Sequence, residues 1–265
     1  MRDDRLRDDQ RRIALAEVAK EEAQRHHLVV HLSGAHAYGF PSPDSDLDLK
    51  AIHIADTRAL LGLAPPPPAA NRLEIVDGFE IDYTSNELGQ CVAGLLKGDG
   101  NMLERVFSRA WIGHRDPLCD ALAEHATATL SRRVFRHYQG FARSQYRRVT
   151  EGETPTAKHV LYVLRTALTG VHLLRTGECE PDLTRLHARY DVPEVEALVE
   201  QKQRAEKQPL PDPAAQVAVM DRVLGLLDQA REQSSLPEDP PPEAAAALER
   251  WLVDTRLGRL TRPAG

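Results

Sequence analysis

The sequence predicts an α/β domain (of the α+β kind) with a small mixed β-sheet, followed by an all-helical domain. Two observations predict this class. Short β-rich runs alternate with helical patterns over the first 130 residues, and only helical periodicity follows. At 265 residues with 42% hydrophobic content, the chain can bury one large core or two smaller ones. We expect domains at 1–130 and 131–235, with a Pro-rich linker and short terminal helix at 236–265.

The chain begins with a helical pattern and then reaches its most informative stretch. Apolar residues recur near helical spacing over residues 3–26, where Asp3 and Asp4 suit a helix start. A short β-rich run, a small-residue turn, a Gly/Pro/Ser loop and a second apolar run follow, at 27–32, 33–35, 39–45 and 46–54. The pattern predicts two strands joined by a loop.

Two carboxylates open the second of these strands. Successive side chains of a strand point to opposite faces, so Asp46 and Asp48 share one face while Leu47 and Leu49 pack the other. Neighbouring carboxylates repel each other, and a fold keeps them close mainly to hold a cation. Capping of the loop is the alternative interpretation of this Asp-rich turn.

A hairpin supplies a third carboxylate. After a short helical piece at 57–63 and a proline loop at 64–69, residues 72–84 form a hairpin pattern that turns at Asp77 and Gly78. Its second strand places Glu80, Asp82 and Thr84 on one face. Either Asp82 or Glu80 can therefore join the first pair. Helical patterns at 86–97, 102–107 and 117–130 complete this region.

Everything after residue 130 reads as helix. The predicted helices cover 131–150, 156–176, 192–206, 212–232 and 243–256. Along 156–176, Lys158, Tyr162 and Arg165 line one face at helical spacing.

The first of these helices is strongly basic. Residues 131–150 contain six arginines and no acid, and four of them fall within about 60° on a helical wheel: Arg132, Arg136, Arg143 and Arg147. A wall that contacts nucleic-acid phosphates and a solvated cationic face are both consistent with this pattern.

Composition narrows the class of protein. A formal net charge of −6 argues against a whole-protein nucleic-acid binder, although residues 101–175 hold 12 Lys/Arg against 6 Asp/Glu. Three widely spaced cysteines indicate neither a disulfide framework nor a zinc site. We find no signal peptide or membrane-spanning run, and expect a cytoplasmic protein without a membrane partner.

The assembled pattern resembles the DNA polymerase beta superfamily of nucleotidyltransferases, and more narrowly its RNA-repair-associated (RlaP-like) branch. That pattern is a Gly-Ser turn, a loop, Asp-x-Asp and a distant Asp. The resemblance covers roughly residues 28–180 and is carried by GAHAYGFPSPDSDLDLKAIHI, EIDYTSNEL, KGDGNMLERVFS and KHVLYVLRTALTGVHLLRTGE.

The resemblance implies a set of site residues. It implies that Asp46, Asp48 and Asp82 are catalytic and hold two Mg²⁺ or Mn²⁺ ions, which prefer oxygen ligands. It further implies nucleotide contacts from Ser33, Gly34, Ala35, Ser45, Lys158, Tyr162 and Arg165. Ala35 stands where the family usually has serine, and Tyr162 replaces a frequent histidine.

These residues predict an enzyme that moves a nucleoside monophosphate from an NTP to a hydroxyl group. The expected acceptor is an RNA 3′ end, with a small molecule or a protein as alternatives. A catalytically silent nucleotide- or RNA-binding module is the alternative from another class. Intact carboxylates favour the enzyme, whereas Ala35 favours the silent module. The sequence indicates neither the preferred base nor the oligomeric state.

Overall fold

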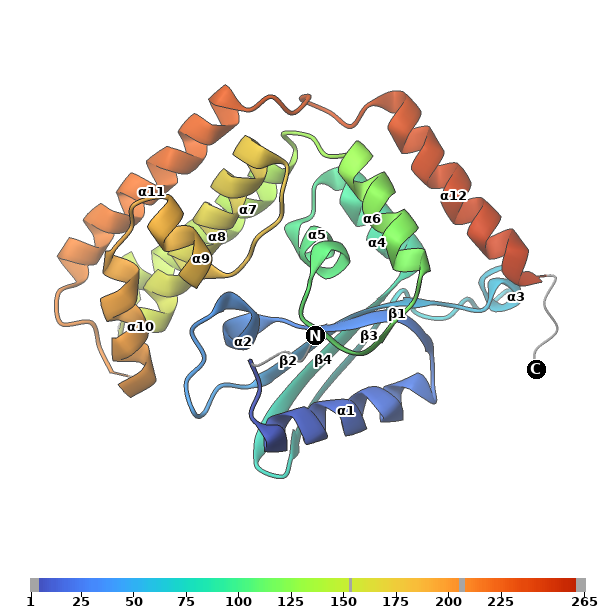
Figure 1. Cartoon of the computed structure of the whole chain (residues 1–265), viewed down its shortest axis with the longest axis horizontal. Helices are drawn as coiled ribbons and strands as arrows, with labels where there is room; N and C mark the ends of the chain where they lie inside the picture. The colour runs from blue at the N-terminus through green and yellow to red at the C-terminus, as the bar shows by residue number, and fades with distance from the viewer. Residues whose placement is uncertain (1–4, 153, 205–207, 261–265) are drawn as a thin grey trace. The chain divides into compact units, whose positions relative to one another are not determined.

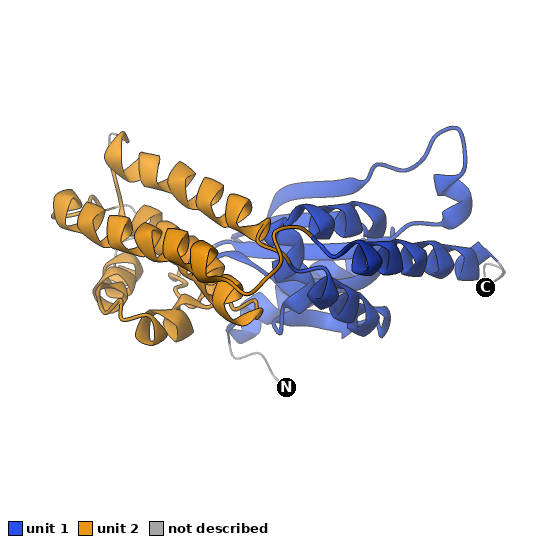
Figure 2. Ribbon diagram, turned by 90° about the horizontal axis from the view of Figure 1, so that it is seen from above, with its two compact units in different colours: residues 1–34, 46–130, 240–265 blue, residues 35–45, 131–239 orange. Residues whose placement is uncertain are grey.

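The computed structural model describes residues 5–152, 154–204 and 208–260, and over these ranges the chain forms two compact units (Figure 2). Unit 1 takes its described residues from before Ala35, from 46–130 and from Pro240 onward. Unit 2 consists of residues 35–45 and the described part of 131–239. Unit 1 holds a β-sheet and unit 2 is helical, which confirms the predicted fold class.

The described part of unit 1 is built on a five-stranded mixed sheet with strand order β3-β4-β2-β1-β5 (Figure 1). Strands β2 and β4 are parallel, and the other neighbouring pairs are antiparallel. The strands are β1 (His26–Leu32), β2 (Leu47–Ile54), β3 (Ala69–Val76), β4 (Phe79–Glu87) and β5 (Trp111–Arg115).

The predicted hairpin is confirmed as β3–β4. Asp77 and Gly78 form its turn with φ of 50° and 84°. Positive φ at both central residues is the geometry of the tight hairpin turn that Asp-Gly favours.

Helices cover both faces of this sheet. In Figure 1, α1 lies on one face, and α4, α5 and α6 lie on the other. The helices that lie wholly or partly in unit 1 are α1 (Asp8–Glu22), α2 (Gly34–Tyr38), α3 (Thr57–Leu60), α4 (Leu88–Lys97), α5 (Gly100–Phe107), α6 (Leu118–Ala128) and α12 (Pro242–Leu260).

The contacts of α1 show which side chains share its face. Arg72 of β3 pairs with Glu17 and Glu21 of α1, at 2.5 Å and 2.8 Å, and its guanidinium lies 5.9 Å from the Tyr83 ring centroid. Tyr83 therefore faces α1. Because side chains alternate along a strand, Asp82 of β4 points to the opposite face.

The last described helix, α12, packs against α3, α4 and α6 of unit 1. The Arg256 guanidinium lies 2.8 Å from the carboxylate of Glu87, whose side chain is almost fully buried. The Thr57 hydroxyl donates to the Arg256 carbonyl at 2.9 Å. These contacts attach α12 to unit 1.

Unit 2 is organised around α8, which packs against each of the other long helices of the unit. Nearly all of its residues from Val160 to Leu174 are buried. Besides residues 35–38 of α2, the helices of the described part of unit 2 are α7 (Val134–Thr150), α8 (Ala157–Thr176), α9 (Leu183–Arg189), α10 (Glu194–Arg204) and α11 (Pro213–Gln233).

Several element boundaries differ from the sequence expectation. β2 begins at Leu47, so Asp46 lies just before the strand rather than on it. α7 begins at Val134, so Arg132 precedes the helix. β5 and α9 were not predicted. The predicted helix 3–26 is observed as α1, and residues 3 and 4 lie outside the described ranges. The predicted helix 192–206 is observed as α10, and residues 205 and 206 lie outside those ranges.

Among the described helices, none combines the length and the apolar character that a membrane span requires.

Candidate active site

The centre of the candidate site is a pair of carboxylates on two parallel strands. Asp48 of β2 and Asp82 of β4 are register partners in the parallel ladder. Both side chains are partly exposed, at 25% and 44%. Their backbone neighbours Leu47, Leu49 and Ile81 are buried, so packing on the α1 face holds the carboxylates on the opposite face of the sheet. The partly exposed area of that face around Asp48 and Asp82 is called the open face below.

A lysine lies between these two carboxylates. The Nζ of Lys50 lies 2.8 Å from Oδ2 of Asp82 and 3.8 Å from Oδ1 of Asp48. It also donates to the Asp82 carbonyl at 3.3 Å and lies 3.5 Å from the Thr84 hydroxyl. Lys50 therefore supplies one of the positive charges that neighbouring carboxylates require.

The small-residue turn lies directly against Asp48. Gly34 has φ of 59°, and a Cβ built on it would overlap the Asp48 carboxylate. The backbone N–H of Ser33 donates to the Asp48 carbonyl at 2.9 Å. Glycine is thus required at position 34 both for backbone conformation and for the approach of the carboxylate.

The donor chemistry of this site suits a hard divalent cation. Asp46 is exposed directly before β2, so all three predicted carboxylates are on the surface of unit 1 at its sheet. Among the described residues, no three His, Cys, Asp or Glu side chains converge in the way that a metal site needs. The carboxylates thus fit Mg²⁺ or Mn²⁺ in ligand type, while Asp48 and Asp82 lie on either side of Lys50.

Unit 2 places Ser45 in a different hydrogen-bond network. The Ser45 hydroxyl accepts from the Ser42 N–H at 2.8 Å, and the two hydroxyls are 2.9 Å apart. Lys202 of α10 donates to Ser42 Oγ at 2.8 Å and to Ser45 Oγ at 3.3 Å. Lys202 is fully buried. In this structure Ser45 therefore contacts the core of unit 2.

The predicted nucleotide residues of α8 lie in and beside an aromatic cluster. Tyr162 packs edge to face on Tyr38 and Phe40, with ring centroids 6.0 Å and 5.7 Å away. The Arg165 guanidinium lies 3.7 Å from the Tyr38 ring centroid and the residue is only 5% exposed. Lys158 is half-buried one turn before Tyr162, and Ala35, at the start of the 35–45 segment, is buried.

The basic residues of the predicted helix 131–150 separate into two groups. Arg132 binds the connector that leads out of α11: its Nε donates to the Leu236 carbonyl at 2.8 Å, and its guanidinium lies 3.6 Å from Glu238. Arg136, Arg143 and Arg147 lie exposed on α7. Within the described part of the chain, no hydrogen bond or ion pair engages these three guanidinium groups.

Two buried histidines lie in the sheet below the site. Burial, helped by Arg25, lowers the pKa of His27 to about 4, and its Nε2 is 2.7 Å from the Tyr83 hydroxyl. Burial, helped by Arg105, lowers the pKa of His31 to about 3, and its Nδ1 is 2.6 Å from the Leu32 carbonyl. Both rings are therefore neutral in the folded protein near pH 7.

Sequence reasoning did not include Lys50 or Lys202. A signal for Lys50 was present, because it lies two residues after Asp48 and alternation puts both on one face. Lys202 had no local signal, since its partners Ser42 and Ser45 are 160 and 157 residues away in the sequence.

A match to a protein family gives the class of this protein, a nucleotidyltransferase of the polymerase beta type and therefore an enzyme class. The profile of the RNA repair pathway DNA polymerase beta family (RlaP) matches residues 10–254. The chain therefore belongs to this family.

Two further comparisons found similar proteins. An uncharacterized protein of Methanocaldococcus jannaschii is 26% identical over 219 residues, which span 80% of this chain and 88% of that protein. The crystal structure of a nucleotidyltransferase-like protein from Exiguobacterium sibiricum aligns with 96% of this chain and 81% of that chain, at 12% identity and a TM-score of 0.35.

Proposed function

We propose that this protein transfers a nucleoside monophosphate from an NTP to a hydroxyl acceptor and releases pyrophosphate. The observation that carries the proposal is the register pairing of Asp48 and Asp82 on parallel strands, with Lys50 between them. Such a concentration of carboxylates on an open face costs electrostatic free energy unless cations offset it. A polyphosphate substrate brings its own divalent cations, which explains why the fold keeps the pair.

In this proposal Asp46, Asp48 and Asp82 hold two Mg²⁺ or Mn²⁺ ions. When bound, the ions lower the pKa of the attacking hydroxyl and neutralise the leaving pyrophosphate. The protein's part is to fix the carboxylates. Gly34 lets the Asp48 carboxylate lie against the turn, and buried Leu47 and Leu49 hold the strand that carries it.

The nucleotide contacts are part of the same proposal. At the turn of Ser33, Gly34 and Ala35, the backbone N–H groups of Gly34 and Ala35 bind phosphate oxygens, because the Ser33 N–H already donates to the Asp48 carbonyl. The missing hydroxyl at Ala35 then costs about 0.5–1.5 kcal/mol of nucleotide binding and leaves the chemistry intact. Ser45, Lys158, Tyr162 and Arg165 complete the proposed nucleotide set. Lys158 is half-buried whereas Arg165 is only 5% exposed, so Lys158 is the more accessible of these two basic side chains.

The acceptor we propose is the 3′ hydroxyl of an RNA. Membership of an RNA repair family supports this choice, and so do the exposed guanidinium groups of Arg136, Arg143 and Arg147 on α7. These arginines have no structural partner in the described part of the chain, as expected for side chains that bind phosphates.

One observation favours a second candidate, a catalytically silent nucleotide-binding or RNA-binding module. Lys50 already neutralises part of the carboxylate charge, with its Nζ 2.8 Å from Asp82. A domain that keeps the fold only for recognition has no need of divalent ions there. Turnover separates the two candidates.

The test is an incubation of the purified protein with Mg²⁺ or Mn²⁺, each α-labelled NTP in turn, and a pool of small RNAs. The control is the Asp46→Ala/Asp48→Ala double variant. Label on RNA with the wild type alone supports the transferase and identifies the nucleotide. Label on a small molecule or on protein contradicts the RNA acceptor, and NTP binding without any turnover supports the silent module.

A further inference from the structure

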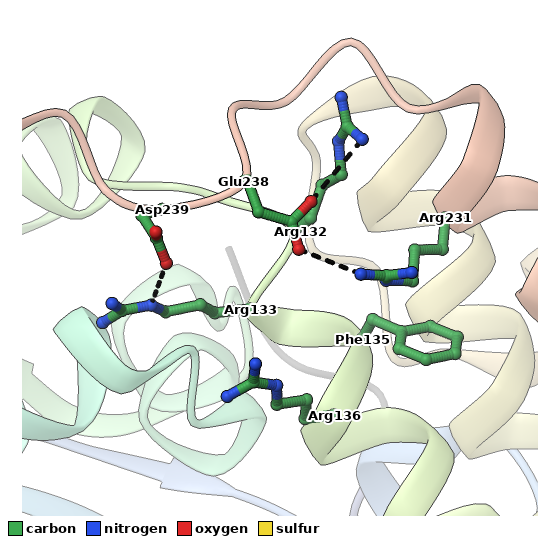
Figure 3. Close-up of a pocket in the computed structure, with 7 residues that line it drawn as sticks. All are labelled: Arg132, Arg133, Phe135, Arg136, Arg231, Glu238 and Asp239. Carbon is green, nitrogen blue, oxygen red and sulfur yellow. Dashed lines mark hydrogen bonds and ion pairs between the residues drawn. The ribbon is translucent and has the colours of Figure 1, made fainter.

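Unit 2 contains a pocket lined mainly by arginines (Figure 3). It has a volume of about 220 Å³ and lies where the start of α7, the last turns of α11 and the connector after α11 meet. We call it the arginine pocket. Its lining residues are Arg132, Arg133, Phe135, Arg136, Arg231, Glu238 and Asp239.

Positive charge exceeds negative charge in this pocket. Glu238 is shared by two arginines, at 2.9 Å from Arg231 and 3.6 Å from Arg132, and Asp239 lies 2.7 Å from Arg133. Arg136 has no such contact with any described residue, and Figure 3 shows it without a dashed line. Four guanidinium groups therefore face two carboxylates among the lining residues.

A purely structural role explains only part of this arrangement. Arg132 donates to the Leu236 carbonyl, and Arg133 and Arg231 hold Asp239 and Glu238, so these three arginines fasten the connector. The role of Arg136 is not structural in this sense, because its side chain is exposed.

Arg136 is also the first member of a row along α7. Arg136, Arg143 and Arg147 are exposed at spacings of seven and four residues, which put them on one side of the helix over about 16 Å. Gly140 lies between them, and a Cβ built on it would meet no atom within 4 Å. The row is therefore an open cationic surface that ends at the arginine pocket.

We propose that the arginine pocket binds a phosphate group of single-stranded RNA, with Arg136 and Arg231 as its ligands, and that the strand continues along Arg143 and Arg147. The proposal rests on the proposed function, because it concerns how the RNA acceptor is held. Arginine suits this role, since its planar guanidinium donates two parallel hydrogen bonds to phosphate oxygens. The phosphate comes either from the 5′ end of the strand or from an internal phosphodiester.

The test measures binding rather than turnover, in the Asp48→Asn background without NTP. A labelled RNA dodecamer, with and without a 5′ phosphate, is titrated at several salt concentrations by fluorescence anisotropy. We expect Arg136→Ala to weaken binding about 5-fold and to reduce the magnitude of the salt slope by about 0.7, the loss of one phosphate contact on a single strand. Preference for the phosphorylated strand identifies a terminal phosphate, and equal binding identifies an internal one.

The matched control is Arg148→Ala, which removes the same charge from an exposed position of α7. Position 148 is about 120° around the helix from position 136, so this variant should bind as the unsubstituted protein does. Equal losses for Arg136→Ala and Arg148→Ala would show non-specific attraction and overturn the proposal. Unchanged affinity in Arg136→Ala would overturn it as well.

A second variant, Glu238→Gln, is expected to bind RNA more tightly, a result that misfolding would not produce. Glu238→Gln keeps the shape of the side chain and removes the carboxylate that faces Arg231 and Arg132. We expect about 3-fold tighter binding and a steeper salt dependence. Weaker or unchanged binding would contradict a phosphate ligand here. These experiments measure RNA binding and not NMP transfer. A catalytically silent protein can therefore show the expected binding, and an active transferase can lack it.

Discussion

Asp48 and Asp82 are direct register partners on the parallel strands β2 and β4, and the Nζ of Lys50 lies within 4 Å of both carboxylates. Like charges in such positions repel, and Lys50 lies close enough to both carboxylates to offset part of that repulsion. The divalent cations proposed above would offset it further. This relationship leads to three of the predictions below.

The first prediction separates Asp82 from Glu80, which share the open face of β4. Asp82→Asn should reduce NMP transfer about 10²–10³-fold, as expected when a preorganised charge at a reacting phosphate is lost. Stability should change by less than about 1 kcal/mol, because the Asp82 side chain is 44% exposed. Glu80→Gln is the matched control and should remain active. The measurement is the initial rate with labelled NTP, and loss of activity in Glu80→Gln alone would reassign the third carboxylate.

The second prediction concerns Gly34. Gly34→Ala should lower the free energy of unfolding and also abolish transfer, because its Cβ would displace the Asp48 carboxylate. Gly78→Ala is the control, since Gly78 also has positive φ but open space around it. It should cost only the backbone strain of about 1–2 kcal/mol and leave the rate unchanged. Urea unfolding and rates for both variants provide the measurement, and an active Gly34→Ala protein would contradict the close approach described here.

The third prediction concerns the exchange of Lys50 for metal ions. Lys50→Met should lower the melting temperature in EDTA by several degrees, since Lys50 then no longer offsets the repulsion between Asp48 and Asp82. Adding Mg²⁺ should raise the melting temperature of Lys50→Met more than that of the wild type. Differential scanning fluorimetry over a Mg²⁺ titration measures both effects. Identical Mg²⁺ shifts in the two proteins would mean that the ions do not bind at this pair.

The fourth prediction is a loss of stability in acid. His27 has a folded pKa of about 4, below the 6.5 of an exposed histidine, so the unfolded chain binds more protons as the pH falls. His27 therefore stabilises the fold above pH 6.5, and this contribution is lost between about pH 6.5 and 4, by about 3 kcal/mol. His31 adds to the same trend.

Urea unfolding at pH 7.5, 6 and 5 measures this slope. His27→Gln should be less stable in neutral buffer but should flatten the acid dependence, because glutamine does not titrate. His114→Gln is the control, since His114 is exposed on β5. An equal acid slope in His27→Gln and the wild type would assign the effect to other groups.

Much of this fold was readable from local patterns. Asp77-Gly78 between two alternating runs predicted the β3–β4 hairpin, and the apolar spacing of residues 156–176 predicted α8. These features depend on neighbours in sequence, where turn chemistry and periodicity act directly. Only one part of the pairing between Asp48 and Asp82 was predictable. The alternation of side chains along a strand predicted the face of the sheet on which each lies, whereas their parallel register depends on the packing of β2 beside β4.

Other features depend on contacts between distant residues. The β-rich run at Trp111–Arg115 is short and interrupted by Gly113. The local sequence therefore gives little sign that this run forms β5 and pairs with β1. Arg132 was grouped with the α7 arginines because it shares their helical phase, yet it binds the connector at Leu236, about a hundred residues away. The roles of Ser42 and Ser45 depend in the same way on Lys202.

The attachment of α12 has a consequence for biosynthesis. A ribosome makes the sheet of unit 1 and all the described helices of unit 2 before it reaches Pro242. Until α12 emerges, the carboxylate of Glu87 lacks its Arg256 guanidinium and the surfaces of α4 and α6 lack their cover. Unit 1 is therefore translated first but completes its packing last, when α12 is made. Nascent chains that stop before residue 242 should be substrates for cellular chaperones and proteases.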